Sequence, residues 1–337
     1  MQALILAGGE GTRLRPLTIN TPKPIVPIGN EPFLVRQILA LKSAGIQDIT
    51  LSLNYQPTAI EKVIGDGSNY GVNLRYIVEP APMGTAGAYK FAANHLKETT
   101  LVLNGDILTD LDLLEIINHH QNLNADATIF LTGVENPSAY GLVQFDEELR
   151  VVRFLEKPSV EEIEKLKLNT INAGIYVLEP NILELIPDGE KYSFEYQLFP
   201  DLLSRKAKFY AFVSNDNYWL DIGTPTRYLQ ANLDLMSGKY KSTVNSAKQS
   251  HNQIDNNSIV GANGSIKKGA EIISSIVGES VVIGANAVVR NSVIWRGAKI
   301  GENSKVVDSI VGFDSEIEEN FCLDKAMVSD GVFDTIV

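Results

Sequence analysis

The chain has 337 residues, of which 29 are Lys or Arg and 41 are Asp or Glu, so its formal net charge is −12. Such a surface repels nucleic acid and anionic membranes, which excludes both as expected partners, and any phosphate site must gather its cations locally. A single cysteine, Cys322, excludes an intramolecular disulfide. Neither a signal peptide nor a membrane-length apolar run is visible, so the expected location is the cytoplasm.

Up to residue 236 the sequence alternates short β-branched runs with amphipathic segments, a pattern typical of a mostly parallel sheet covered by helices. Residues 1–236 are therefore predicted to form a Rossmann-like α/β domain. Strands are expected at 2–7, 49–53, 74–78, 100–104, 126–132, 171–178 and 208–213. Helices are expected at 31–44, 57–64, 85–97, 111–120, 180–186, 194–205 and 225–237.

The composition changes after Met236. Residues 237–253 are rich in Ser, Lys, Asn and Gln and are expected to form a linker. Beyond it, over 254–337, an aliphatic residue recurs with a 17-residue period, in steps of 6, 6 and 5 within each repeat. The positions are Val260, Ile266, Ile272, Val277, Ile283, Val289, Ile294, Ile300, Val306, Val311, Ile317 and Leu323.

This period predicts a triangular β-solenoid, in which each rung has three short strands and one inward aliphatic side chain on each face. Small residues that follow the aliphatic ones, such as Gly261, Gly278 and Gly284, fit the corners. A β-sandwich is the alternative, but a sandwich does not keep a fixed 17-residue phase.

A glycine-rich turn, Gly8-Gly9-Glu10-Gly11-Thr12-Arg13, follows the first strand. In α/β proteins such a turn binds phosphate, because backbone N–H groups converge there and glycine allows close approach. The turn is not a P-loop, and Leu14 stands where a dinucleotide-binding loop has its last glycine. Arg13, Arg15 and Lys23 bring cations near the glycines, and prolines on both sides of Lys23 stiffen its segment. The turn is therefore predicted to bind phosphates, although Arg15 alone also fits a solvated surface cation.

The run Leu6–Thr18, together with Pro22-Lys23-Pro24, resembles the signature of the sugar nucleotidyltransferases. With the solenoid included, the chain resembles mannose-1-phosphate guanylyltransferases that carry a left-handed β-helix of hexapeptide repeats. The resemblance implies an enzyme that joins a nucleoside triphosphate, GTP in this group, to a sugar 1-phosphate and releases pyrophosphate. It also implies Mg²⁺ as cofactor. The edge strands of the solenoid need covering, so a homo-oligomer formed through the β-helix is expected, with an allosteric surface as the alternative.

The resemblance assigns roles residue by residue. Arg13 and Lys23 are the expected catalytic residues, which grip the phosphates while a sugar-phosphate oxygen attacks the α-phosphorus without a protein nucleophile. Asp106 and Asp221 are the expected Mg²⁺ ligands, although either one alone also fits a helix cap or a turn. The nucleotide is expected to contact Ala7, Gly8, Gly9, Gly11, Thr12, Arg13, Glu79 and Gly84, and the sugar phosphate Gly141, Glu156, Lys157 and Asn172.

Base choice depends on Glu79, which stands where uridylyl and thymidylyl members of the family carry glutamine. An ionised carboxylate only accepts hydrogen bonds, and guanine offers two adjacent donors, N1–H and the 2-amino group. Glu79 therefore favours GTP. The alternative is that Glu79 faces solvent while backbone groups read the base, which leaves UTP and dTTP open.

Two other functions are open from the sequence. A non-catalytic paralogue that binds a nucleotide sugar and regulates an active subunit is expected to lack parts of the glycine turn, all of which are present here. A solenoid with its own acyltransferase site needs a histidine base, but His251, the only histidine of the second half, precedes the first rung. The motifs do not distinguish mannose, glucose and heptose phosphates.

Overall fold

The computed structural model of the protein describes residues 1–242 and 253–336. His251 and most of the predicted linker, 237–253, lie outside these ranges. Helix α7 (Pro225–Ser237) has the bounds predicted for it. None of the helices within the described ranges is long and apolar enough to cross a membrane.

Contacts within the chain group it into two compact units. The first unit, Met1–Gly9 with Ile38–Trp219, is an α/β sheet with its helices. The second unit joins the segment Glu10–Gln37 to the chain from Leu220 onward, which includes α7 and the solenoid. The segment that carries Arg13 and Lys23 thus belongs to the same compact unit as the solenoid.

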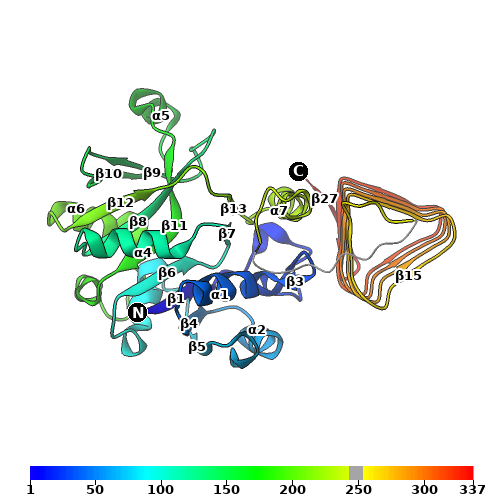
Figure 1. Cartoon of the computed structure of the whole chain (residues 1–337), viewed down its shortest axis with the longest axis horizontal. Helices are drawn as coiled ribbons and strands as arrows, with labels where there is room; N and C mark the ends of the chain where they lie inside the picture. Colours follow the sequence, from blue (N-terminus) through cyan, green and yellow to red (C-terminus); the bar gives the residue numbers. More distant parts are fainter. Residues whose placement is uncertain (243–252, 337) are drawn as a thin grey trace. The chain divides into compact units, whose positions relative to one another are not determined.

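A nine-stranded sheet forms the first unit, with the strand order β10-β9-β11-β6-β1-β4-β5 and with β8 between β11 and β12 (Figure 1). Strands β6, β1, β4 and β5 are parallel as predicted, whereas β11 pairs with both β6 and β8 in the antiparallel direction. Every predicted strand is confirmed to within one residue. The strands are β1 (Gln2–Leu6), β4 (Asp48–Leu53), β5 (Asn73–Val78), β6 (Thr100–Asn104), β8 (Ala127–Gly133), β9 (Gly141–Phe145), β10 (Val151–Glu156), β11 (Thr170–Leu178) and β12 (Phe209–Val213).

The central strands read as nearly continuous apolar runs because they are buried on both faces. Ala3, Leu4 and Ile5 of β1 have no exposed surface, and Leu101 and Val102 of β6 have none either. Parallel strands of this kind bring their carboxyl ends to one edge of the sheet, so the glycine turn after β1 and the residues after β6 lie at the same edge.

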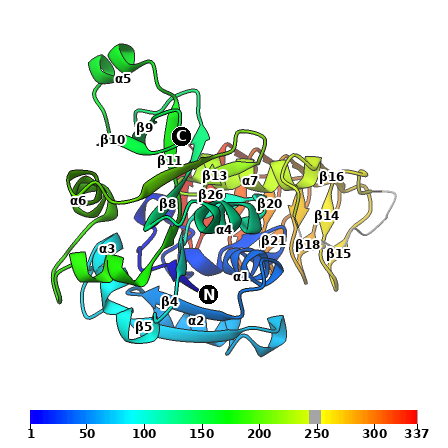
Figure 2. The same ribbon diagram turned by 60° about the vertical axis from the view of Figure 1, so that its left-hand side comes forward.

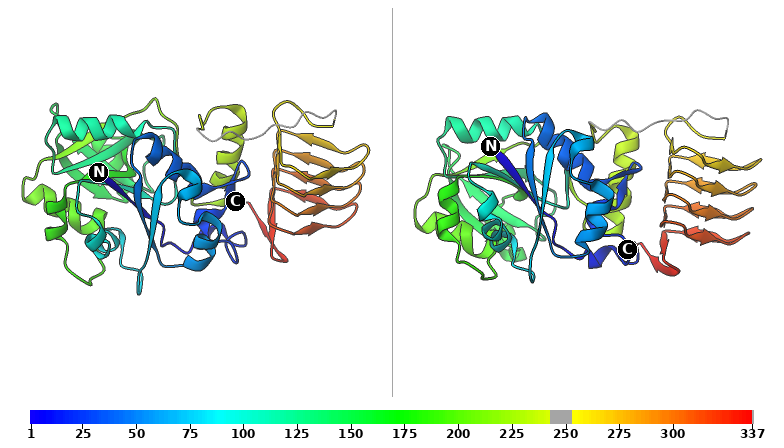
Figure 3. Two further views of the ribbon diagram at one scale, coloured as in Figure 1. Left: turned by 60° about the horizontal axis from the view of Figure 1, so that its bottom comes forward. Right: turned by 90° about the horizontal axis from the view of Figure 1, so that it is seen from below.

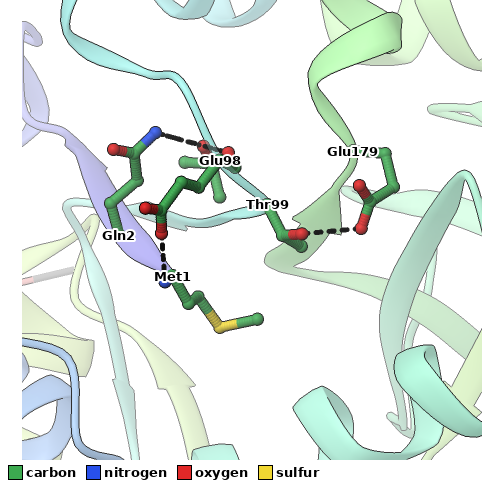
Figure 4. Close-up of polar contacts among 6 residues, drawn as sticks. Met1, Gln2, Glu98, Thr99 and Glu179 are labelled. Atoms are coloured by element: carbon green, nitrogen blue, oxygen red, sulfur yellow. Dashed lines mark hydrogen bonds and ion pairs between the residues drawn. The ribbon is translucent and has the colours of Figure 1, made fainter.

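Polar contacts fix the start of β1, at the edge opposite the glycine turn (Figure 4). The amino group of Met1 forms an ion pair with Glu98, and Gln2 Nε2 donates a hydrogen bond to the Glu98 carbonyl at 3.3 Å. Thr99 Oγ1 donates to Glu179 Oε1 at 2.7 Å. Because β1 pairs with β6 from Gln2 onward, these contacts hold the two strands that lead to the predicted phosphate site.

The helices of the α/β part follow the predicted amphipathic segments, and α4 lies against β8 and β11 (Figure 2). Four predicted segments differ in detail. The segment 31–44 begins with a short strand over Glu31–Pro32 and is helical only from Phe33. The segment 85–97 is helical only to Phe91 and then forms a 3-10 turn, 180–186 is a 3-10 helix, and 194–205 begins as a π-helix. The bounds are α1 (Phe33–Ser43), α2 (Pro57–Ile64), α3 (Thr85–Phe91), η4 (Ala93–His95), α4 (Leu113–Asn122), η5 (Pro180–Leu185), η6 (Phe194–Leu198) and α6 (Phe199–Ser204).

Several short elements were not predicted from the sequence. The antiparallel pair β9 and β10 was missed because β10 exposes Val152 and Arg153 together, which breaks the alternation of a half-buried strand. Helix α5 (Val160–Leu166) was missed because it buries no residue, although Ser159 and Glu162 form a capping box at its start. The strands β2 (Pro27–Ile28), β3 (Glu31–Pro32), β7 (Ile107–Thr109) and β13 (Trp219–Asp221) were also missed.

The predicted β-solenoid is present in the second unit, where Figure 1 shows it end-on as a triangle and Figure 3 shows its rungs from the side. Three stacks of parallel strands form its faces. Paired residues of neighbouring rungs are 17 apart, as in Val260 with Val277 and Ile283 with Ile300. All the predicted inward positions lie in strands and are buried, except Ile266, which is half-buried.

The solenoid strands are short, and their bounds repeat with the rungs. They are β14 (Ile259–Val260), β15 (Ser265–Ile266), β16 (Glu271–Ile273), β17 (Ile276–Val277), β18 (Val282–Ile283), β19 (Val288–Arg290), β20 (Val293–Ile294), β21 (Lys299–Ile300), β22 (Lys305–Val307), β23 (Ile310–Val311), β24 (Glu316–Ile317), β25 (Cys322–Asp324), β26 (Ala326–Ser329) and β27 (Val332–Thr335). The last strand, β27, pairs antiparallel with β26 and so covers that edge of the stack.

Small and amide side chains turn the corners of the rungs, as expected. A Cβ on Gly278 would lie 2.4 Å from the backbone nitrogen of the next rung, so only glycine fits that corner without a shift. Asn286, Asn303 and Asn320 adopt left-handed φ values of 55°, 58° and 59°. Their side-chain amides form a ladder with Nδ2–Oδ1 distances of 3.2 Å, which satisfies polar groups that the turns leave exposed.

Candidate active site

The turn after β1 lies close to the ends of β4 and β6. Ala7 N–H donates to the Ser52 carbonyl at 2.9 Å, and Gly105 N–H donates to the Leu6 carbonyl at 2.8 Å. A Cβ on Gly105 would lie 2.7 Å from the Leu6 oxygen, so glycine allows this close approach. Asp106 follows directly, at the edge where ligands bind in open α/β sheets.

Glu79 follows β5 and faces this turn. Its carboxylate Oε1 lies 3.2 Å from the position that a Cβ on Gly8 would take, whereas Gly9 has open space at its Cβ position. Glu79 is only 8% exposed, so it does not face solvent. Oε1 accepts a hydrogen bond from Ser52 Oγ at 2.8 Å, and Oε2 accepts one from Met83 N–H at 3.1 Å. Each oxygen retains acceptor capacity, so the carboxylate shapes its loop and can still accept from a base.

Gly84 ends the loop that begins at Glu79. Its φ of +76° lies in the left-handed region, and a Cβ there would lie 2.6 Å from the Tyr192 carbonyl oxygen. The Met83 carbonyl accepts from Tyr192 N–H at 2.8 Å, and Gly87 N–H donates back to the Tyr192 carbonyl at 2.8 Å. The end of the loop is therefore held by backbone contacts on both sides of Gly84.

Glu156, at the end of β10, lies across from Gly141 of β9. A Cβ on Gly141 would lie 2.9 Å from Glu156 Oε2, so the missing side chain leaves room for this carboxylate. Burial raises the pKa of Glu156, the negative charge of Glu195 raises it further, and Lys157 lowers it. Lys157 is exposed and has a left-handed φ of 48°, with its N–H donating to the Tyr140 carbonyl at 3.2 Å.

Asn172 lies in an irregular stretch of β11, where its side chain is already hydrogen-bonded. Its Oδ1 accepts from Gly174 N–H at 3.0 Å, and its Nδ2 donates to the Tyr176 hydroxyl at 2.9 Å. Beside it, Trp219 Nε1 donates to the Ala173 carbonyl at 2.9 Å, and the Trp219 ring packs edge-on against Tyr140. Asn172 thus has one amide hydrogen left for a ligand.

Glu195 is a candidate site residue that sequence analysis missed. Its carboxylate accepts from Thr85 Oγ1 at 3.0 Å and from Ser193 Oγ, and it is the charged group that raises the pKa of Glu156. The ring of Phe194 packs 5.0 Å from that of Tyr176, which fixes the turn that carries Glu195. Its only local signal, a serine followed by an acidic residue, is typical of any helix N-terminus.

In the second unit, Gly11 packs against Lys23. Gly11 has a φ of +65° and precedes the 3-10 helix η1 (Thr12–Leu14), where Thr12 is exposed. Thr18 Oγ1 donates to the Gly11 carbonyl at 2.7 Å, and a Cβ on Gly11 would lie 3.2 Å from Lys23 Cβ. Lys23 begins the 3-10 helix η2 (Lys23–Ile25) and is 8% exposed, which is unusual for a lysine.

Arg13 and Asp221, which lie far apart in the sequence, meet at Gly223. A Cβ on Gly223 would lie 2.5 Å from Asp221 Oδ1 and 2.8 Å from an Arg13 guanidinium nitrogen. Asp221 Oδ1 accepts from Gly223 N–H at 2.7 Å, and Oδ2 forms an ion pair with Arg227 in the first turn of α7. Sequence analysis missed Arg227, since an arginine in a helix gives no signal of a partner. Arg15 is exposed and pairs with Glu10 at 3.5 Å, which fits a surface cation.

Three pairs of predicted site residues therefore meet in the structure. Gly8 meets Glu79 after β1, Gly141 meets Glu156 at the end of β10, and Arg13 meets Asp221 at Gly223. Arg13, Lys23 and Asp221 belong to the second unit, and Asp106 belongs to the first. No group of three or more His, Cys, Asp or Glu side chains suited to a metal occurs in residues 1–242 and 253–336.

The structure combines an α/β sheet whose central strands are parallel, a glycine turn after the first strand with basic residues close behind it, and a 17-residue solenoid. These features define the class of α/β nucleotide-binding folds with an appended β-solenoid. Comparison with protein families agrees with this class. Residues 2–238 match the family described as nucleotidyl transferase, and residues 241–331 match the one described as GMPPB C-terminal domain. The chain belongs to the nucleotidyl transferase family.

Several curated proteins are similar to this chain. Mannose-1-phosphate guanylyltransferase of Mycobacterium tuberculosis is 40% identical over 240 residues, which cover 71% of this chain and 65% of that protein. Mannose-1-phosphate guanyltransferase of Yarrowia lipolytica is 43% identical over 234 residues, which cover 68% of this chain and 62% of that protein. The chain thus spans less than two thirds of the length of these two relatives.

Solved structures also resemble the chain. The HddC protein of Yersinia pseudotuberculosis complexed with GMP-PN is 32% identical with a TM-score of 0.58, and the match covers 69% of this chain and 99% of that one. A putative glucose-1-phosphate thymidylyltransferase from Bacillus anthracis has a TM-score of 0.61 at 24% identity, which concerns the fold alone.

Proposed function

We propose that the protein is an enzyme that transfers a nucleotidyl group from a nucleoside triphosphate to a sugar 1-phosphate and releases pyrophosphate. The favoured reaction is GTP plus mannose 1-phosphate to GDP-mannose, in the cytoplasm. The observation that carries the proposal is the pair of basic residues behind the glycine turn, with Lys23 buried against Gly11 and Arg13 beside Asp221. Relatives named mannose-1-phosphate guanylyltransferase support the choice of substrates.

In this reaction an oxygen of the sugar phosphate forms a bond to the α-phosphorus, and the bond from that phosphorus to the bridging oxygen breaks. Pyrophosphate leaves with the electron pair, so the protein supplies positioning and charge but no nucleophile. N–H groups of Gly8, Gly9 and Gly11 are suited to hold the phosphates. Lys23 is assigned to the α-phosphate and Arg13 to the leaving phosphates, where their charges offset the charge of the transition state.

Mg²⁺ is the proposed cofactor, with Asp106 and Asp221 as its protein ligands. Carboxylate and phosphate oxygens are the hard donors that Mg²⁺ takes, and one or two carboxylates are sufficient beside a nucleotide. When bound, the ion neutralises phosphate charge. Asp221 already accepts hydrogen bonds from Gly223 and Arg227, so it is held in one orientation and Arg227 balances its charge.

The sugar phosphate is assigned to the site around β9, β10 and β11. Glu156 is placed to accept hydrogen bonds from sugar hydroxyls, in the space that Gly141 leaves open. Asn172 has one amide hydrogen available, and the exposed Lys157 can pair with the phosphate. Both Glu156 and Lys157 act here as ligand contacts rather than as an isolated surface pair.

The function is tested with a matrix of nucleotides and sugar phosphates, with released pyrophosphate as the readout. The nucleotides are GTP, UTP and dTTP, and the sugars are mannose 1-phosphate, glucose 1-phosphate and a heptose phosphate. We expect the highest kcat/KM for GTP with mannose 1-phosphate in the presence of Mg²⁺. Release of no pyrophosphate from any pair would contradict an enzyme and favour a regulatory paralogue that binds a nucleotide sugar.

Glu79→Gln is expected to lower the preference for GTP over UTP. A carboxylate accepts from both guanine donors, whereas uracil presents one donor and one carbonyl oxygen. A charged hydrogen bond contributes about 1.5–3 kcal/mol, so we expect a wild-type preference of about ten- to a few hundred-fold that falls toward one in the variant. The measurement is the ratio of kcat/KM for the two nucleotides.

Ser52→Ala is the matched control for Glu79→Gln. It removes the hydrogen bond from Ser52 Oγ to Glu79 Oε1 and leaves the carboxylate charged. We expect a higher KM for GTP but a nearly unchanged ratio of GTP to UTP use. An unchanged ratio in Glu79→Gln, or a wild type that prefers UTP, would show that backbone groups select the base.

A further inference from the structure

One corner of the solenoid departs from its own repeat. At positions 261, 278, 312 and 329 the residue after the inward aliphatic side chain is Gly, Gly, Gly and Ser, but at 295 it is Trp. Trp295 is nevertheless only 1% exposed, and it is among the largest fully buried side chains of the described chain. The inward stack of the solenoid is aliphatic and does not require a tryptophan. The presence of Trp295 is therefore explained by its contacts outside that stack.

Trp295 contacts helix α7 of the same compact unit. Its Nε1 donates to the Tyr228 hydroxyl at 2.9 Å, and the two rings meet edge-on with centroids 6.2 Å apart. The Tyr228 hydroxyl in turn donates to the Pro27 carbonyl. Burial raises the pKa of Tyr228, so the hydroxyl stays protonated and keeps this donor. Tyr228 therefore links the solenoid to the segment that follows Lys23.

Further hydrogen bonds hold the β2–β3 hairpin between α7 and the solenoid. Gly29 N–H donates to Asn232 Oδ1 at 3.0 Å, and Asn232 Nδ2 donates to the Tyr228 carbonyl at 2.9 Å. From the same turn, Asn30 Nδ2 donates to the carbonyl of Val277, which lies one rung before Trp295. The hairpin is thus fixed from both sides by buried or half-buried polar contacts.

These contacts connect the solenoid to the residues that are assigned to the phosphates. Lys23 is four residues before Pro27, and η2 occupies most of the interval. Arg227, the neighbour of Tyr228, forms the ion pair with Asp221, which lies beside Arg13. A shift of Tyr228 would therefore reach both the lysine and the aspartate.

We propose that Trp295 is a positioning residue for nucleotidyl transfer and acts through Tyr228. The solenoid then takes part in catalysis by holding the segment of Lys23, in addition to any role in assembly. This inference rests on the proposed function of Lys23 and Asp221.

Trp295→Phe tests the proposal, since it keeps an aromatic ring and removes the N–H donor. Loss of the link to Tyr228 is expected to lower kcat about tenfold and to raise the Kd of a non-hydrolysable GTP analogue severalfold, as misplacement of a charged group does. The KM for the sugar phosphate is expected to change less than twofold, because Glu156 and Asn172 belong to the first unit. Tyr228→Phe is the second variant and is expected to reproduce this split.

Val289→Ala is the control for loss of solenoid stability alone. Val289 is fully buried in the inward stack. It belongs to β19, on another face of the solenoid than β20, the strand just before Trp295. Its truncation should therefore lower the melting temperature without changing kcat. Lys23→Met supplies the second background. If Trp295 positions Lys23, Trp295→Phe should lower kcat much less in the Lys23→Met protein than in wild type. If Trp295 is merely structural, it should lower kcat by the same factor in both proteins.

Two results would overturn the proposal. One is a wild-type kcat and a wild-type analogue affinity in both Trp295→Phe and Tyr228→Phe. The other is a loss of kcat on Trp295→Phe that is equally large in wild type and in Lys23→Met. A wild type that binds the analogue but releases no pyrophosphate would instead contradict the proposed function. The analogue affinities of the variants then decide whether Trp295 positions the site.

Discussion

Asp221→Asn is expected to lower kcat for pyrophosphate release by about two to three orders of magnitude while the protein stays folded. Asparagine keeps an oxygen that can accept from Gly223 N–H, which is 2.7 Å from Asp221 Oδ1. It removes the negative charge that pairs with Arg227 and that is proposed to hold Mg²⁺. The substitution therefore tests the effect of the negative charge while the hydrogen bond to the backbone is kept.

The measurement is kcat with GTP and mannose 1-phosphate at saturating Mg²⁺, together with thermal melting. Asp216→Asn is the matched control, because Asp216 is exposed in the turn before β13 and the same charge is removed. We expect the control to retain wild-type kcat. Arg227→Met removes the ion pair and leaves the Asp221 carboxylate in place, so a loss as large as that of Asp221→Asn would assign the effect to Arg227. Full activity in excess chelator would contradict the two-carboxylate Mg²⁺ site.

Ile283→Asp is expected to destabilise the solenoid by about 4 kcal/mol or more, which is enough to unfold it at physiological temperature. Ile283 has no exposed surface and lies in the inward stack between Ile266 and Ile300. A carboxylate there loses its hydration and meets only aliphatic side chains, so no partner offsets the cost.

Val282→Asp is the matched control for Ile283→Asp. Val282 precedes Ile283 in the same strand, is half-buried and points to the opposite face, so the same new charge stays hydrated. We expect less than about 1 kcal/mol of destabilisation from it. The measurement is urea unfolding and melting temperature, with oligomeric size as a second readout. Equal stability of the two variants would contradict the 17-residue register.

The sequence by itself determined the elements whose pattern is local. The strands from β1 to β12 that carry continuous or alternating apolar runs were predicted to within one residue, because burial on one or both faces requires that pattern. The solenoid register was predicted as well, since each rung repeats the same contact with the next one at a fixed interval. The glycine turn and the segment of Lys23 were recognisable because glycine frees the backbone and proline restricts it wherever they occur.

Other features of the site depend on contacts that no local pattern encodes. The sequence predicted Glu79 as a contact of the base but could not show that Ser52 and Met83 hold its carboxylate. Glu195 affects Glu156 only through the folding of the π turn against β11, so its role has no signal in the chain.

Tertiary structure alone also decided the links of the second unit. Arg227 meets Asp221 because a strand end and the start of α7 turn toward each other, and Trp295 meets Tyr228 across 67 residues. The sequence did give one indication of the contact between Trp295 and Tyr228, because a tryptophan stands where the other rungs have a small corner residue. Periodicity reports which face of an element is buried, whereas the identity of the covering partner follows only when distant segments pack and exclude water together.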